Sequence, residues 1–167
     1  VCLWPELAAA IGIEGEVDAG TSVMMCYIGL IMGDFASGFL SQIFKSRKRI
    51  VGVFMACTGL FSLFYLFVPA AGFTPVYIYN LALILGFFIG YWAVFVTIGA
   101  EQFGTNIRAT VTTTVPNFVR GSVVVVNLAF AMLKDTFSLP MSAFIVGVGV
   151  FTISFIALWR LQETYGK

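Results

Sequence analysis

Long apolar runs are the feature that most restricts how this chain folds. A bilayer has a hydrocarbon core of about 30 Å, which about 20 helical residues cross. Five stretches reach that length, at residues 21–44, 50–69, 76–97, 109–133 and 139–161. Inside lipid every backbone amide needs a partner within the protein, so such runs form helices. The sequence therefore predicts an all-α integral membrane protein with five transmembrane helices.

The composition agrees with lipid as the solvent. Hydrophobic residues make up 60% of the chain and charged residues 10%, whereas soluble domains carry about 25% charged residues. The net charge of +1 provides no basic field for nucleic acid. The chain lacks histidine and its three cysteines form no CxxC pair, so we predict no metal, no cofactor and no catalytic residue.

The positions of the basic residues predict the orientation, because cytoplasmic loops hold the excess of lysine and arginine. Residues 45–49 read KSRKR, whereas residues 1–20 contain acidic residues and no basic one. We therefore place 45–49 and the C-terminus in the cytoplasm and 1–20 outside, as an extracytoplasmic loop that is entered from something upstream. The predicted location is a plasma or inner membrane, with several passes.

Two ionisable residues lie at mid-depth in the predicted spans. Asp34 is about ten residues, or about 15 Å, from the cytoplasmic end of its span, and Arg120 lies about 18 Å beyond Arg108. Charges at this depth cost at least ~2.5 kcal/mol each and normally face the bundle interior or a water-filled cavity. We predict that both line a solute pathway, and direct pairing of Asp34 with Arg120 is a hypothesis.

Polar residues accompany Arg120 at helical spacing. Thr113, Asn117, Arg120 and Asn127 follow intervals of four, three and seven, which place them on one helix face. This polar stripe lines a solute route or forms hydrogen bonds between helices, and the sequence leaves both open. Asn80, near the outer end of the third span, is a weaker pathway candidate.

Small residues indicate where helices approach closely. Gly29 and Gly33 lie four residues apart on the first span, and Gly86 and Gly90 do so on the third. This spacing allows close backbone contact between membrane helices. With Gly38, these glycines form the predicted packing set.

Three motifs resemble the major facilitator superfamily of secondary transporters. Residues 38–42 and 45–49, GFLSQ and KSRKR, are similar to its cytoplasmic signature, with Gln42 in place of an acid. Residues 100–109, AEQFGTNIRA, resemble a loop of its sugar and organic-ion porters, with Gly104 in place of proline. Residues 163–166, ETYG, resemble the end of the same porters.

The resemblance implies a twelve-helix transporter of which these spans are the last five, following missing N-terminal helices. The first, third and fourth spans would line the cavity. A cytoplasmic gate would comprise Gln42, Arg47, Arg49, Glu101, Arg108 and Glu163. The implied function is transport of a small polar or anionic solute by alternating access, as an ion-coupled symporter.

Two other classes remain as alternatives. A non-transporting assembly or receptor subunit would also have apolar helices, although it has little need for a mid-depth arginine. An integral membrane enzyme would need a nucleophile and base or a metal cluster near the interface, and no such constellation stands out in the sequence.

Overall fold

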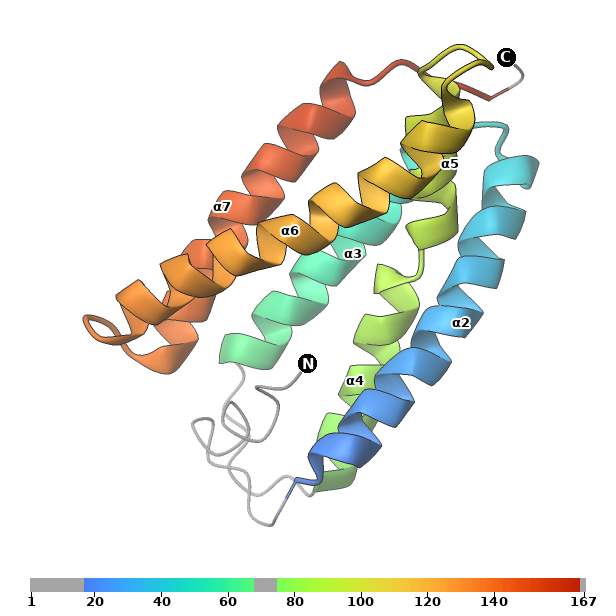
Figure 1. Ribbon diagram of the computed structural model, residues 1–167. Helices are drawn as coiled ribbons and strands as arrows, with labels where there is room; N and C mark the ends of the chain where they lie inside the picture. Colours follow the sequence, from blue (N-terminus) through green and yellow to red (C-terminus); the bar gives the residue numbers. More distant parts are fainter. Residues whose placement is uncertain (1–16, 68–74, 166–167) are drawn as a thin grey trace.

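The computed structural model describes residues 17–67 and 75–165, and in these residues the chain is helical without strands. The helices are α2 (Ala19–Ile43), α3 (Arg47–Phe67), α4 (Pro75–Ile89), α5 (Trp92–Glu101), α6 (Arg108–Lys134) and α7 (Leu139–Arg160), as Figure 1 shows. The predicted outer loop 1–20 lies mostly outside the described residues.

Four helical segments of the described chain are long and apolar enough to cross a membrane: α2, the pair α4–α5, α6 and α7. The sequence predicts five, so the count differs by one. The predicted second span, 50–69, coincides with α3, and its residues 68 and 69 lie outside the described part. These apolar helices fit a multi-pass membrane protein.

The third predicted span is two helices rather than one. The sequence predicts a continuous helix over 76–97, but α4 ends at Ile89 and α5 begins at Trp92. Gly90 and Tyr91 form the break between them. At the start of α5 the backbone N–H of Ala93 donates to Asp34 of the neighbouring helix α2, whereas in an uninterrupted helix it would donate to the carbonyl four residues earlier.

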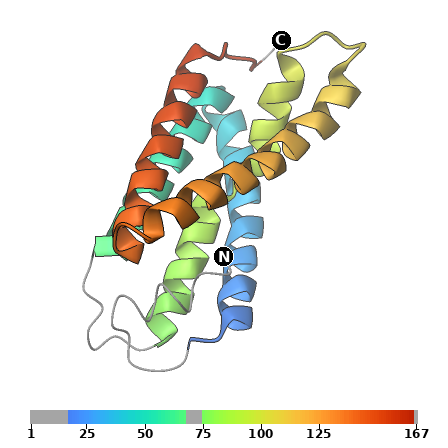
Figure 2. The same cartoon turned by 60° about the vertical axis from the view of Figure 1, so that its left-hand side comes forward.

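The helices pack unequally. α2 lies along α4, and α3 contacts α4 and α7. Phe54 and Phe61 of α3 pack against Phe88 of α4, with ring centroids 5.9 Å and 5.2 Å apart. α6 runs obliquely from the end of α5 to the start of α7 (Figure 2) and contains no buried residue.

The core lies mainly between α2 and α4. Its buried members are Cys26 with Ile78, Leu81, Ala82 and Leu85. A smaller cluster joins α3 to α5 through Val51, Val94 and Ile98. Most other large apolar side chains are exposed, as suits helices whose surroundings are apolar.

The ends of α2 show how local chemistry sets its length. The carboxylate of Asp18 accepts hydrogen bonds from the Thr21 N–H at 2.6 Å and the Thr21 hydroxyl at 2.7 Å, which is the geometry of an N-cap. These hydrogen bonds, the hydroxyl's foremost, lower the pKa of Asp18. At the other end Lys45 adopts a φ of 48°, which reverses the chain toward α3.

Candidate functional site

The break between α4 and α5 lies against Asp34 of α2. One carboxylate oxygen of Asp34, Oδ1, accepts a hydrogen bond of 3.2 Å from the backbone N–H of Ala93. Ala93 is in the first turn of α5, and the residue that precedes this helix, Tyr91, provides no side-chain cap. Asp34 therefore caps α5 from a neighbouring helix, where the positive end of the helix dipole favours a carboxylate.

Glycines bring the two segments close enough for this contact. An ideal Cβ added to Gly90 would lie 2.6 Å from the Gly33 Cα and 2.7 Å from the Asp34 N. A Cβ on Gly29 or Gly86 would come as close to the opposite backbone, at 2.0 Å from Leu83 O and 2.1 Å from Cys26 O. Only glycine fits at these positions, because any side chain would push α2 away from α4–α5.

Gly38 differs from the other glycines of the predicted packing set. No heavy atom lies within 4 Å of an ideal Cβ on Gly38. The reason is the helix face on which it lies: Gly38 is five residues after Gly33, or about 140° around α2, whereas Ser37 and Ser41 continue the face of Gly33 and are buried.

Asp34 and Arg120 are not paired. Among the described residues, the ion pair that forms joins Arg47 to Glu101. Asp34 is half-buried on α2, while Arg120 is exposed on α6. The two helices belong to different sides of the bundle, since α6 packs against α5 and α7.

The polar stripe of α6 faces open space. Thr113, Asn117, Arg120 and Asn127 are all exposed, and the Thr113 hydroxyl donates to the Thr110 carbonyl of its own helix at 2.9 Å. α6 continues as a helix through Pro116. Asn80 is likewise exposed, in the second turn of α4.

A second cluster lies at one end of the bundle, where α2, α5 and α7 end and α3 and α6 begin. We call it the basic end, formed by residues 44–49, 101–108 and 159–165. Arg47, in the first turn of α3, forms its ion pair with Glu101, the last residue of α5. Both side chains are partly covered, with 24% and 14% of their surface exposed.

Glu163 lies at the start of α3 and binds several donors. Its carboxylate accepts hydrogen bonds from the Ser46 hydroxyl, from the Arg47 N–H at 3.1 Å and from the N–H groups of Thr164 and Tyr165. Partial burial alone would raise the pKa of Glu163, but these hydrogen bonds, led by that of Ser46, outweigh burial and lower the pKa. Glu163 is therefore an anionic cap of α3 supplied by the C-terminal tail.

Four further contacts connect the segments of the basic end. Lys48 Nζ donates to the carbonyl oxygens of Trp159 and Leu161, each at 2.8 Å. Gln102 Nε2 donates to Gln162 O at 2.9 Å. The Tyr165 hydroxyl approaches the Gln42 carbonyl at 3.5 Å, so Gln42 takes part through its backbone.

No family model, curated protein or solved structure matches this chain.

The structure divides the predicted gate residues. It brings Arg47, Glu101 and Glu163 together, whereas Arg49 and Arg108 are exposed and form no ion pair with described residues. The sequence prediction missed Ser46 and Lys48 as members. The signal for Ser46 is its residue type directly before a helix, and its hydroxyl indeed accepts a hydrogen bond from the Arg49 N–H at 3.4 Å.

The two clusters differ in what they can do chemically. The basic end holds helix termini together through contacts that a relative motion of α3, α5 and the C-terminal tail would break. Asp34 is a carboxylate at the discontinuity of an apolar segment, where its negative charge is attracted to the N-terminus of α5. Within the described residues, no group of three or more histidine, cysteine and acidic side chains could hold a metal ion.

Proposed function

We propose that this chain is part of a proton-coupled membrane transporter in which Asp34 binds the coupling proton. Five helices then span the bilayer, with α3 as the additional one. α3 has 21 residues, or about 31 Å at 1.5 Å per residue, and no acidic or basic residue after Arg49. The resemblance of the sequence motifs to the major facilitator superfamily supports the same reading.

The contact between Asp34 and the α4–α5 break carries this proposal. Ionisable residues within apolar spans are costly and are functional by default. Transporters commonly bind substrates and coupling ions where a transmembrane helix is discontinuous. The Ala93 N–H that donates to Asp34 lies at the N-terminus of α5, directly after such a discontinuity. Protonation of Asp34 would weaken this cap and allow the break to rearrange.

The basic end would act as the cytoplasmic gate of the transporter. The positive-inside rule supports a cytoplasmic location for it, since it contains Lys45, Arg47, Lys48, Arg49, Arg108 and Arg160. The Arg47–Glu101 pair and the Glu163 cap would form in one conformer and separate in the other. An interaction that exists in only one of two conformers biases their equilibrium by its own free energy.

The exposed polar face of α6 would line the route of the solute. Arg120 and the neighbouring threonine and asparagine side chains suit a carboxylate, phosphate or polyhydroxy solute. The face would be covered by further helices of the same protein, around which this half rocks during alternating access.

Uptake by the full-length protein in vesicles tests the proposal. Labelled monosaccharides, carboxylates and phosphate esters would be offered under an imposed proton gradient. Asp34→Asn keeps an oxygen that accepts from Ala93 but removes the charge and the proton site. We expect gradient-driven accumulation to fall to background in this variant, with the same amount of folded protein.

Asp135→Asn is the matched control, since Asp135 is exposed at the far end of α6. It should accumulate solute as the unaltered protein does. Equal accumulation by the Asp34→Asn variant would show that Asp34 is only a structural cap. Absence of accumulation for every solute by the unaltered protein would contradict transport itself.

A further inference from the structure

An open groove runs between α3 and α7 on the outside of the bundle. It has a part of about 830 Å³ at the basic end and a part of about 790 Å³ farther along the helices. Phe155 and Ile156 line both parts, so the two form one continuous surface. We call it the α3–α7 groove.

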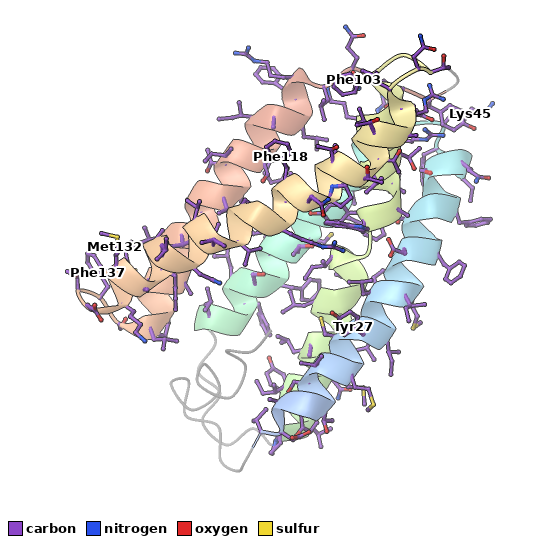
Figure 3. The ribbon with its side chains drawn as sticks, in the orientation of Figure 1. Tyr27, Lys45, Phe103, Phe118, Met132 and Phe137 are labelled. Atoms are coloured by element: carbon purple, nitrogen blue, oxygen red, sulfur yellow. The ribbon has the colours of Figure 1, made fainter. Side chains whose placement is uncertain are left out.

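The part at the basic end is cationic and aromatic. Lys45, Lys48 and Arg49 line it together with Trp159, whose side chain is 83% exposed. Figure 3 places Lys45 at this end of the bundle. Glu163 also lines it, but its carboxylate is occupied by Ser46 and the backbone of Arg47. Three basic side chains against one carboxylate leave a net positive charge for a ligand.

The other part is apolar. Leu60, Leu63 and Val148 line it and are 66%, 40% and 46% exposed. Gly147 leaves its wall open, with no heavy atom within 4 Å of an ideal Cβ. The groove extends along α3 from Lys48 to Leu66, which is about 27 Å at 1.5 Å per residue. It is longer than one leaflet of the hydrocarbon core, which is about 15 Å deep.

We infer that the α3–α7 groove binds an anionic phospholipid. Its phosphate would lie among Lys45, Lys48 and Arg49, and an acyl chain would follow Leu60 and Leu63 toward the far end. Basic pockets between membrane helices on the cytoplasmic side bind anionic headgroups in this way, and an exposed tryptophan beside them lies at the depth of the headgroups.

Charge complementarity selects this occupant over a second protein helix. A helix filling the groove would leave two or three cations facing an apolar surface, which is costly without acidic partners. The inference requires the helices to lie in a bilayer but does not depend on transport or on Asp34.

Quenching of Trp159 fluorescence by brominated lipids tests whether the α3–α7 groove binds an anionic phospholipid. The full-length protein would be reconstituted in phosphatidylcholine vesicles that contain increasing fractions of brominated phosphatidylglycerol, or of brominated phosphatidylcholine as the neutral comparison. Subtracting the signal of the Trp159→Phe protein isolates Trp159. We expect stronger quenching by the anionic lipid at equal fractions.

The double variant Lys45→Gln/Arg49→Gln should lower that preference by about fivefold for each charge removed. Both side chains are exposed, so the fold should tolerate the change. Arg160→Gln is the matched control, because Arg160 lies at the same end but does not line the groove. It should keep the preference.

Three results would overturn the inference. Equal quenching by both lipids would exclude an anionic site. Equal loss in the Arg160→Gln control would show a diffuse surface charge. Absence of quenching by either lipid would show that protein, either a second copy or other helices of this chain, covers the groove.

Discussion

Replacing Gly33 by alanine should separate α2 from the α4–α5 segment. A Cβ at this position would lie 2.0 Å from the Phe87 carbonyl oxygen, 2.8 Å from its carbon and 2.9 Å from the Gly90 Cα. All three atoms belong to the backbone and cannot turn aside. Since Cβ contacts under 3.0 Å essentially never occur, the helices must move apart by at least about 1 Å.

The cost of that movement follows from packing. A gap of 0.5–1 Å forfeits roughly a quarter to a half of the dispersion energy of each contact across an interface. Overpacked sites typically lose about 1–3 kcal/mol, and we expect the Gly33→Ala variant to lose an amount in this range. The same movement would lengthen the 3.2 Å hydrogen bond between Asp34 and Ala93 beyond a bonding distance.

Gly38→Ala is the matched control in the same helix. No heavy atom lies within 4 Å of its ideal Cβ, and alanine is the better helix former by up to about 1 kcal/mol. This variant should be as stable as the unaltered protein or slightly more so.

Denaturant unfolding of the purified full-length protein in mixed lipid–detergent micelles, followed by circular dichroism, measures both variants. The reasoning requires a loss for Gly33→Ala and none for Gly38→Ala. If both alanines change the free energy of unfolding by the same amount, close backbone contact at Gly33 does not hold α2 against α4–α5.

Two further predictions concern the basic end. Because the pKa of Glu163 is lowered in the fold, its charge stabilises the protein above its ordinary pKa of 4.5, and this stabilisation is lost as the pH falls through the lower folded value. Thermal scans of the purified Glu163→Gln protein between about pH 5 and 3 should therefore show a weaker dependence of stability on pH. An unchanged slope would refute the cap. Arg47→Gln should destabilise the basic end by between about 1 kcal/mol, as for an exposed pair, and about 3 kcal/mol, as for a buried one. The exchange Arg47→Glu/Glu101→Arg should restore most of the lost stability. Failure of that rescue would show that the pair contributes little.

The length and polarity of the helices could be predicted from the sequence. The predicted spans 21–44, 109–133 and 139–161 differ from α2, α6 and α7 by no more than a few residues at each end. Such boundaries depend on hydropathy summed along a segment and on local caps such as Asp18, which require no knowledge of neighbours.

The break at Gly90 and Tyr91 could not be predicted in this way. No proline marks it, and a glycine is tolerated within membrane helices. It depends on Gly33 approaching Gly90 and on the Asp34 carboxylate capping α5, both of which come from another helix.

The same limit applies to the polar residues. Intervals along one helix place Arg120 and Asn117 on a common face, but they do not say which helix that face meets. Arg47 reaches Glu101 whereas Arg49, two residues later on α3, points elsewhere and forms no ion pair with described residues. Sequence alone determined which segments favour lipid, because hydropathy is a property of each segment. Only the tertiary structure decided which side chains meet, because this depends on the rotation and crossing of helices that are distant along the chain.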